Sequence, residues 1–97
     1  MTWFSHMKWM VIKPMTYKEL IENIMTINGT RVFIKQMKET MILIFWKGSS
    51  PIAHVFVNSY EYSLEYPLLY EMDLYDILKI DAWLYEFVNT NIEDREL

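Results

Sequence analysis

The first clear pattern of hydrophobic and polar positions lies in residues 16–29. Apolar residues recur there every three or four positions, which predicts a helix over residues 17–26 with one buried stripe. Thr16 and Glu19 form a capping box before this helix, because the hydroxyl accepts an orphan amide and the carboxylate reaches back. The Asn-Gly pair after the helix supplies a left-handed stop. The stripe consists of Leu20, Ile21, Ile24 and Met25.

From residue 30 the period of the pattern changes to two, which is typical of half-buried β-strands. Val32 and Ile34 alternate with the residues of the opposite face. Residues 41–46 form an unbroken run of β-favouring apolar residues, which suits a central strand covered on both faces. The predicted strands are residues 30–35, 41–46, 52–57 and 60–64, the last of them a short edge strand.

The chain returns to helical spacing after Pro67, which ends the sheet. We place Asp73 as the N-cap of a second helix, with Asp76 in the first turn, where the helix dipole favours an anion. This helix is predicted to end at residues 90–91, and residues 92–97 form a polar tail that frays. Its buried stripe consists of Ile77, Ile80, Leu84, Phe87 and Val88.

These elements predict a small two-layer α+β domain with the order α-β-β-β-β-α. A three- to four-stranded antiparallel sheet presents a polar face to solvent, and an N-terminal and a C-terminal helix cover its other face. A chain of 97 residues accommodates one hydrophobic core. We assign residues 15–97 to this domain. Residues 1–14 follow neither period and are assigned to an N-terminal extension.

Aromatic and methionine side chains exceed what so small a core usually holds. The chain contains four Trp, seven Tyr, five Phe and eight Met, so we expect some of them at an interface with another copy or a partner. It contains no cysteine, which excludes disulfides and thiolate metal sites and fits a reducing cytoplasm. No uninterrupted apolar run approaches the ~20 residues of a membrane span, so we expect no membrane partner.

Charge is divided unequally along the chain. Residues 1–50 carry seven basic and three acidic residues, a net charge of +4, whereas residues 51–97 carry two basic and ten acidic residues, a net charge of −8. Between Lys47 and Lys79, carboxylates alternate with tyrosines and there is no lysine or arginine. Because tyrosines are enriched at binding hot spots and carboxylates steer encounter with a basic partner, this segment predicts a partner-binding surface. Its candidate contacts are Tyr60, Glu61, Tyr62, Glu65, Tyr66, Tyr70, Glu71, Asp73 and Asp76.

Two other interpretations of this acidic segment stay open. In one, it is a solvated surface whose tyrosines pack their rings at the edge and keep their hydroxyls in water. In the other, lysines of the basic half neutralise it within the molecule. Lys8, Lys35 and Lys38 are the lysines that would then lie against Glu65, Asp73 and Asp76.

Residue patterns that support catalysis or metal binding are sparse. His6 and His54 lack a Cys, Ser or Asp at the spacing of a known triad or metal motif. The two glycines each have a turn to explain them, and neither belongs to a phosphate-binding loop. We therefore assign no catalytic residue, no metal ligand and no cofactor, and we do not expect an enzyme.

A basic strand face provides a second candidate surface. Cations beside an exposed ring on a strand can hold and stack a nucleic-acid strand. The overall acidity argues against direct nucleic-acid binding, so we keep it as an alternative. The residues of this face and its hairpin are Arg31, Phe33, Lys35 and Lys38.

Three stretches of the chain resemble small uncharacterised proteins of phages and prophages from Gram-positive bacteria. MTYKELIENI (residues 15–24) resembles their opening, and VNSYEYSLEY (residues 57–66) resembles their middle segment. LYEFVNTNIEDRE (residues 84–96) resembles their ending, in which a helix of the LLYEYA type runs into TPIEEREE. Here Asn91 stands where that pattern has proline. The resemblance covers about residues 15–97 and leaves out the first fourteen.

The resemblance implies a phage or mobile-element protein that acts in the host cytoplasm without catalysis. Small acidic phage proteins include anti-CRISPR proteins, some of which occupy the DNA-binding surface of Cas9. By this analogy we expect a basic, nucleic-acid-handling host protein, such as a Cas effector, as the partner. The alternatives are a self-associating accessory protein that buries its surplus Trp and Met in a homodimer, and a small nucleic-acid-binding module.

Overall fold

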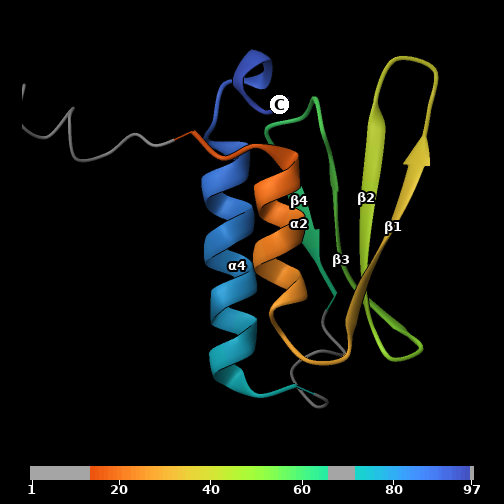
Figure 1. Cartoon of the computed structure of the whole chain (residues 1–97), viewed down its shortest axis with the longest axis vertical. Coiled ribbons are helices and arrows are strands. Elements are labelled where there is room, and N and C mark those ends of the chain that lie inside the picture. Colours follow the sequence, from red (N-terminus) through yellow and green to blue (C-terminus); the bar gives the residue numbers. More distant parts are fainter. Residues whose placement is uncertain (1–13, 66–71, 97) are drawn as a thin grey trace, which may run out of the picture.

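The computed structural model describes residues 14–65 and 72–96. Both helices pack on the same face of a four-stranded antiparallel sheet (Figure 1). This arrangement confirms the predicted α+β architecture and its order α-β-β-β-β-α. The elements are α2 (Tyr17–Met25), β1 (Thr30–Gln36), β2 (Met41–Lys47), β3 (Ser50–Phe56), β4 (Tyr62–Leu64), α4 (Leu74–Val88) and the 3-10 turn η1 (Ile92–Asp94).

Helix α2 begins with the predicted capping box. The Thr16 hydroxyl accepts a hydrogen bond from the Glu19 amide at 3.2 Å, and the Glu19 carboxylate accepts one from the Thr16 amide at 3.1 Å. Leu20 and Ile24 of the predicted stripe are buried against the sheet and α4. The helix ends at Met25, one residue earlier than predicted.

The sheet has the strand order β1-β2-β3-β4, so each strand pairs with its neighbours in sequence. In β2, Leu43 and Phe45 point to the helix side and are fully buried. A register shift after Phe45 leaves both Ile52 and Ala53 of β3 in the core. Strand β4 begins at Tyr62, two residues later than predicted.

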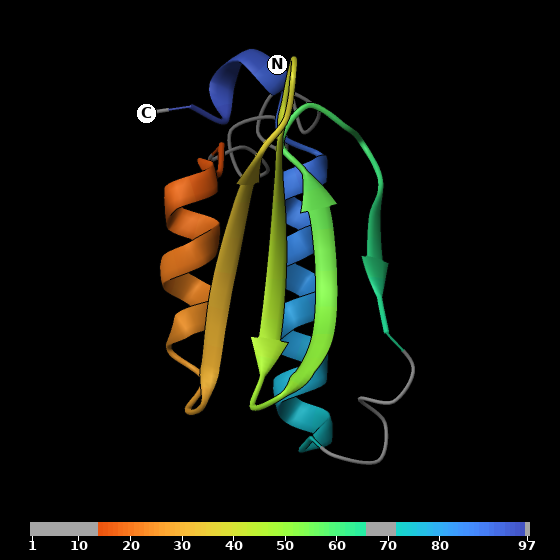
Figure 2. The same cartoon turned by 90° about the vertical axis from the view of Figure 1, so that its right-hand side faces the viewer.

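The sheet face opposite the helices, called here the outer face, has an apolar centre, so the prediction of a polar face is wrong there. The cross-strand pairs place alternate residues of β1, β2 and β3 on this face, away from the core. In Figure 2 no described element lies in front of β2 and β3. Residues 41–46 were predicted to be covered on both faces, but only Leu43 and Phe45 are buried, and the alternate residues on the outer face are half-buried. The apolar residues of the outer face are Phe33, Ile42, Ile44, Trp46 and Phe56.

Helix α4 begins at its predicted N-cap, where the Asp73 carboxylate accepts a hydrogen bond from the Tyr75 amide at 3.3 Å. Its predicted stripe packs on the sheet and on α2, although Ile77 is only half-buried. The buried members of the stripe are Ile80, Leu84, Phe87 and Val88.

The segment after α4 is tied to the domain, so the prediction that residues 92–97 fray is wrong for its described part. Arg95 is fully buried, and its guanidinium donates hydrogen bonds of 2.6–2.9 Å to four backbone carbonyls. These carbonyls belong to the end of α4 and to the turn after β3, where backbone acceptors need donors. The acceptors are Val57, Ser59, Val88 and Thr90.

The start of the described chain lies beside this segment. Met15 is buried, and its amide donates a hydrogen bond to the Thr90 hydroxyl at 3.0 Å. The Tyr17 amide donates to the Arg95 carbonyl at 2.7 Å. The domain therefore includes Met15. Of the predicted extension, residues 1–14, the structure describes only residue 14, and residues 1–13 lie outside the described residues.

Candidate protein-interaction surface

The nine predicted contact residues divide between described and undescribed parts of the chain. Tyr66, Tyr70 and Glu71 lie outside the described residues. The other six come from two places: the segment around β4 and the start of α4. They are Tyr60, Glu61, Tyr62, Glu65, Asp73 and Asp76.

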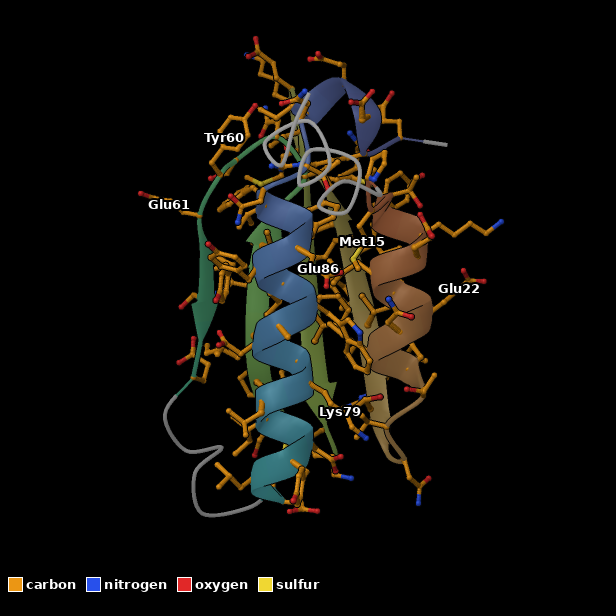
Figure 3. All side chains as sticks on the ribbon, turned by 90° about the vertical axis from the view of Figure 1, so that its left-hand side faces the viewer. Met15, Glu22, Tyr60, Glu61, Lys79 and Glu86 are labelled. Carbon is orange, nitrogen blue, oxygen red and sulfur yellow. The ribbon has the colours of Figure 1, made fainter. Side chains whose placement is uncertain are left out.

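A shallow hollow of about 490 Å³ lies between the start of β4 and the C-terminal half of α4. Figure 3 shows Tyr60 and Glu61 on this side of the molecule, beside α4. The structure thus brings three predicted contacts together with residues of α4, whereas Asp73 and Asp76 lie at the other end of that helix. The lining residues are Tyr60, Glu61, Tyr62, Tyr85, Val88 and Asn89.

One hydrogen bond fixes the two walls of the hollow to each other. The Tyr62 hydroxyl donates to the Asp81 carboxylate at 2.5 Å, which joins the edge strand to α4. Burial, together with the hydrogen bond and the negative charge of Asp81, raises the pKa of Tyr62 to about 12. The phenol therefore remains a hydrogen-bond donor at neutral pH. No local pattern in the sequence indicates that Asp81 is the partner of Tyr62.

Tyr60 lies at the rim of the hollow, and its ring packs against the buried Arg95 side chain. The Arg95 guanidinium lies 4.9 Å from the centroid of the Tyr60 ring, a cation–π contact. Burial lowers the pKa of Arg95, an effect that Tyr60 opposes, and the guanidinium stays charged. The Ser59 hydroxyl accepts the Glu61 amide at 3.1 Å, so the chain turns here and Tyr60 does not join β4. Arg95 was not predicted as a site residue; its local signal is a cation shortly after a predicted helix end.

Helix α4 exposes a stripe of large side chains that leads toward the hollow. Tyr75, Leu78 and Tyr85 are 74%, 55% and 62% exposed. Their spacing of three and seven residues puts them on one face of the helix. Leu74, beside this stripe, is also exposed. Aromatic and aliphatic side chains thus remain accessible along the side of α4 that faces away from the core.

The carboxylates near α4 and β4 have different surroundings. Asp73 caps α4, so its charge stabilises the helix N-terminus. Glu65 lies beside the outer face, with its Oε1 atom 3.9 Å from His54 Nδ1. Glu61 is exposed at the rim of the hollow. Among residues 14–65 and 72–96, no lysine or arginine pairs with Glu61, Asp73 or Asp76.

The lysines offered for internal neutralisation lie elsewhere in the described part of the chain. Lys35 and Lys38 are exposed on β1 and the hairpin that follows it. This strand forms the sheet edge opposite β4. Neither lysine pairs with Glu65, and Lys8 lies outside the described residues. Lys35 and Lys38 therefore leave Glu61, the carboxylate that lines the hollow, accessible.

The part of the chain that the structure describes has no group of three or more His, Asp or Glu side chains positioned to hold a metal ion. None of its helices has the length and apolar character needed to cross a membrane. Comparison of the chain with protein-family models, curated proteins and solved structures found no match.

Proposed function

We propose that this chain is a non-catalytic binding protein that inhibits a basic, nucleic-acid-binding host protein by covering its binding surface. The contact region, called here the α4 surface, consists of Tyr60, Glu61, Leu78, Tyr85 and Glu86. The observation that carries the proposal is the hollow, which has exposed tyrosines on both walls and an unpaired carboxylate at its rim. Tyrosines in such positions supply large contact area with few torsions to immobilise.

The walls of the hollow are fixed before a partner arrives. The Tyr62–Asp81 hydrogen bond holds β4 against α4, and Arg95 supports the Tyr60 ring. A surface with fixed walls loses less conformational entropy on association, which favours tight binding. This rigidity distinguishes the α4 surface from a merely solvated acidic segment.

Negative charge flanks the exposed aromatic residues. Glu61 lies beyond β4, and Glu86 projects from α4 on the side shown in Figure 3. Residues 51–97 carry ten of the thirteen acidic residues of the chain. Such a field accelerates encounter with a basic partner and weakens as salt is added. Binding should therefore depend strongly on ionic strength.

The class of target comes from the resemblance to phage and prophage proteins. Host defence proteins that bind nucleic acid have basic channels, and Cas effectors such as Cas9 hold their guide–target duplex in one. A protein that fills this channel in the host cytoplasm would prevent target DNA binding, as some anti-CRISPR proteins do. We therefore choose a Cas9–guide RNA complex as the first partner to test.

The test measures affinity for the Cas9–guide RNA complex and inhibition of its target DNA binding. Glu61→Lys combined with Glu86→Lys should raise the Kd by at least about tenfold, because like charges then face the basic channel. Glu22→Lys combined with Glu39→Lys is the matched control, because it makes the same change of net charge at two exposed residues, Glu22 on α2 (Figure 3) and Glu39 after β1, and it should leave the Kd within about twofold. If the wild-type protein does not bind the Cas9–guide RNA complex, this target is wrong. If the test and control variants raise the Kd equally, the α4 surface is not the contact region.

A further inference from the structure

The outer face of the sheet lacks a covering element among the described residues, although it is apolar. Phe33 is 60% exposed, and Ile42, Ile44 and Phe56 lie beside it without contributing to the core. The Arg31 guanidinium lies 5.7 Å from the centroid of the Trp46 ring and covers one end of this face. Contiguous apolar side chains on a sheet are typical of a surface that packs against another protein.

The charges that flank this face have opposite signs at its two edges. Arg31 and Lys35 project from β1 on the same side as Phe33, since they alternate with the core-facing residues. Glu65 follows β4 at the opposite edge and lies near His54, which also belongs to the outer face. The face thus has an apolar centre, a basic edge and an acidic edge.

The two edge charges lie at the same level along the strands. Arg31 is opposite Trp46 in β2, and Trp46 is opposite Pro51 in β3. The Glu65 amide donates to the carbonyl of Ile52, the residue after Pro51. Arg31 and Glu65 therefore occupy corresponding positions on opposite edges of one sheet.

We propose that the outer face binds the outer face of a second copy of this chain. A two-fold axis parallel to the strands, between β2 and β3, places β1 of each copy over β4 of the other. Arg31 then meets Glu65 of the second copy twice in one dimer, with the apolar centre packed between the sheets. An axis across the strands would place β1 of one copy over β1 of the other, basic edge against basic edge, so the charges select the first arrangement.

A nucleic-acid strand is the other ligand that an aromatic sheet face can accept. Exposed rings beside cations stack bases in several single-strand-binding modules. Here Glu65 at the acidic edge and a chain net charge of −4 both oppose phosphate binding. A second copy supplies an opposite charge to both the basic and the acidic edge, whereas a nucleic acid supplies one only to the basic edge.

The dimer does not depend on the proposed function. The α4 surface lies on the helix side of the domain, and the outer face lies on the other side of the sheet (Figures 1 and 2). Glu61→Lys with Glu86→Lys tests the α4 surface, while substitutions at Arg31 and Glu65 test the outer face. If the substitutions on one surface have no effect, the result for the other surface can still be interpreted.

The experiment is sedimentation velocity on the full chain over a range of micromolar concentrations. Wild-type protein should sediment as a dimer of 11.8 kDa subunits. Arg31→Glu and Glu65→Arg should each weaken the dimer by at least about tenfold, because each creates two like-charged pairs. Lys18→Glu, an exposed change on α2, is the matched control and should leave the dimer intact. Phe33→Ser should also weaken dimerisation, and its exposure spares the fold.

Mixing the two charge variants gives the decisive result. An Arg31→Glu copy offers two carboxylates and a Glu65→Arg copy offers two cations, so the mixture should form a heterodimer about as stable as the wild type. The double variant should also recover dimerisation. A monomeric wild type, unchanged single variants or a mixture that stays monomeric would each overturn the proposal. Oligonucleotide binding by a monomer that Phe33→Ser abolishes would assign the face to nucleic acid instead.

Discussion

Tyr62 and Asp81 attach the edge strand to the C-terminal helix through a hydrogen bond of 2.5 Å. Strand β4 is three residues long and pairs on one side only, with β3. Such a short edge strand gains little from its ladder, so a side-chain bond to the helix contributes much of its attachment. The same bond sets the width of the hollow that we propose as a binding site.

Tyr62→Phe should lower the free energy of unfolding by about 1.5–3 kcal/mol, because it leaves the half-buried Asp81 carboxylate without its donor. Tyr85→Phe is the matched control, since that hydroxyl is on a mostly exposed side chain and its loss should change stability by less than about 0.5 kcal/mol. Urea unfolding followed by circular dichroism measures both. Equal stabilities of the two variants would contradict a stabilising role for the bond.

Alkaline pH should destabilise the protein through the same residue. The folded pKa of Tyr62, about 12, lies above the ordinary value of 10.0. The stabilisation is therefore complete below pH 10 and is lost as the pH rises toward 12, because the unfolded state releases the phenolic proton first. Unfolding curves of wild type and Tyr62→Phe between pH 9 and 12 test this, and the two stabilities should converge as the pH rises. Parallel curves would contradict it.

Arg95→Met should cost about 3–5 kcal/mol, because it removes the donor from four carbonyls in the interior of the domain. Arg95→Lys should recover only part of this loss, since an ammonium lacks the planar fork that reaches acceptors on two sides. Lys18→Met on the exposed side of α2 is the control and should be nearly neutral. Thermal unfolding of the three variants ranks their stabilities. An Arg95→Met protein as stable as the wild type would contradict the assigned role of Arg95.

Gly29 and Gly48 adopt positive φ angles of 84° and 61°. An alanine at either position should cost about 1–2 kcal/mol, because a Cβ disfavours this conformation. At Gly29 a Cβ would also lie 2.9 Å from Lys47 Nζ, whereas the space around Gly48 is open. Gly29→Ala should therefore cost more than Gly48→Ala. In a Lys47→Met background the two costs should become similar, and urea unfolding of this double-mutant cycle measures the difference.

The sequence predicts the elements of this fold because each one carries a local signal. Thr16 with Glu19 marks the start of α2, and Asp73 marks the start of α4. The change of period at residue 30 separates helix from strand. These signals act within a few residues of the chain, so no knowledge of distant contacts is needed to interpret them.

The parts that the sequence did not predict depend on contacts between distant residues. Arg95 finds its acceptors at Val57 and Ser59, 38 and 36 residues away, and no local pattern indicates that pairing. The Tyr62–Asp81 bond likewise joins residues 19 apart. The outer face was missed for another reason, since an unbroken apolar run such as residues 41–46 does not reveal whether both of its sides are covered.

The long reach of Arg95 has a consequence for how the protein is made. The Arg95 guanidinium donates to the carbonyls of Val57, Ser59 and Val88, and Arg95 is synthesised after all three of these residues. The growing chain can form its hairpins during synthesis, but it cannot complete this packing until Arg95 has left the exit tunnel. Premature termination a few codons before Arg95 would therefore leave a chain with β1 to β4, α2 and α4 but without the contacts that join the segment after α4 to the turn after β3.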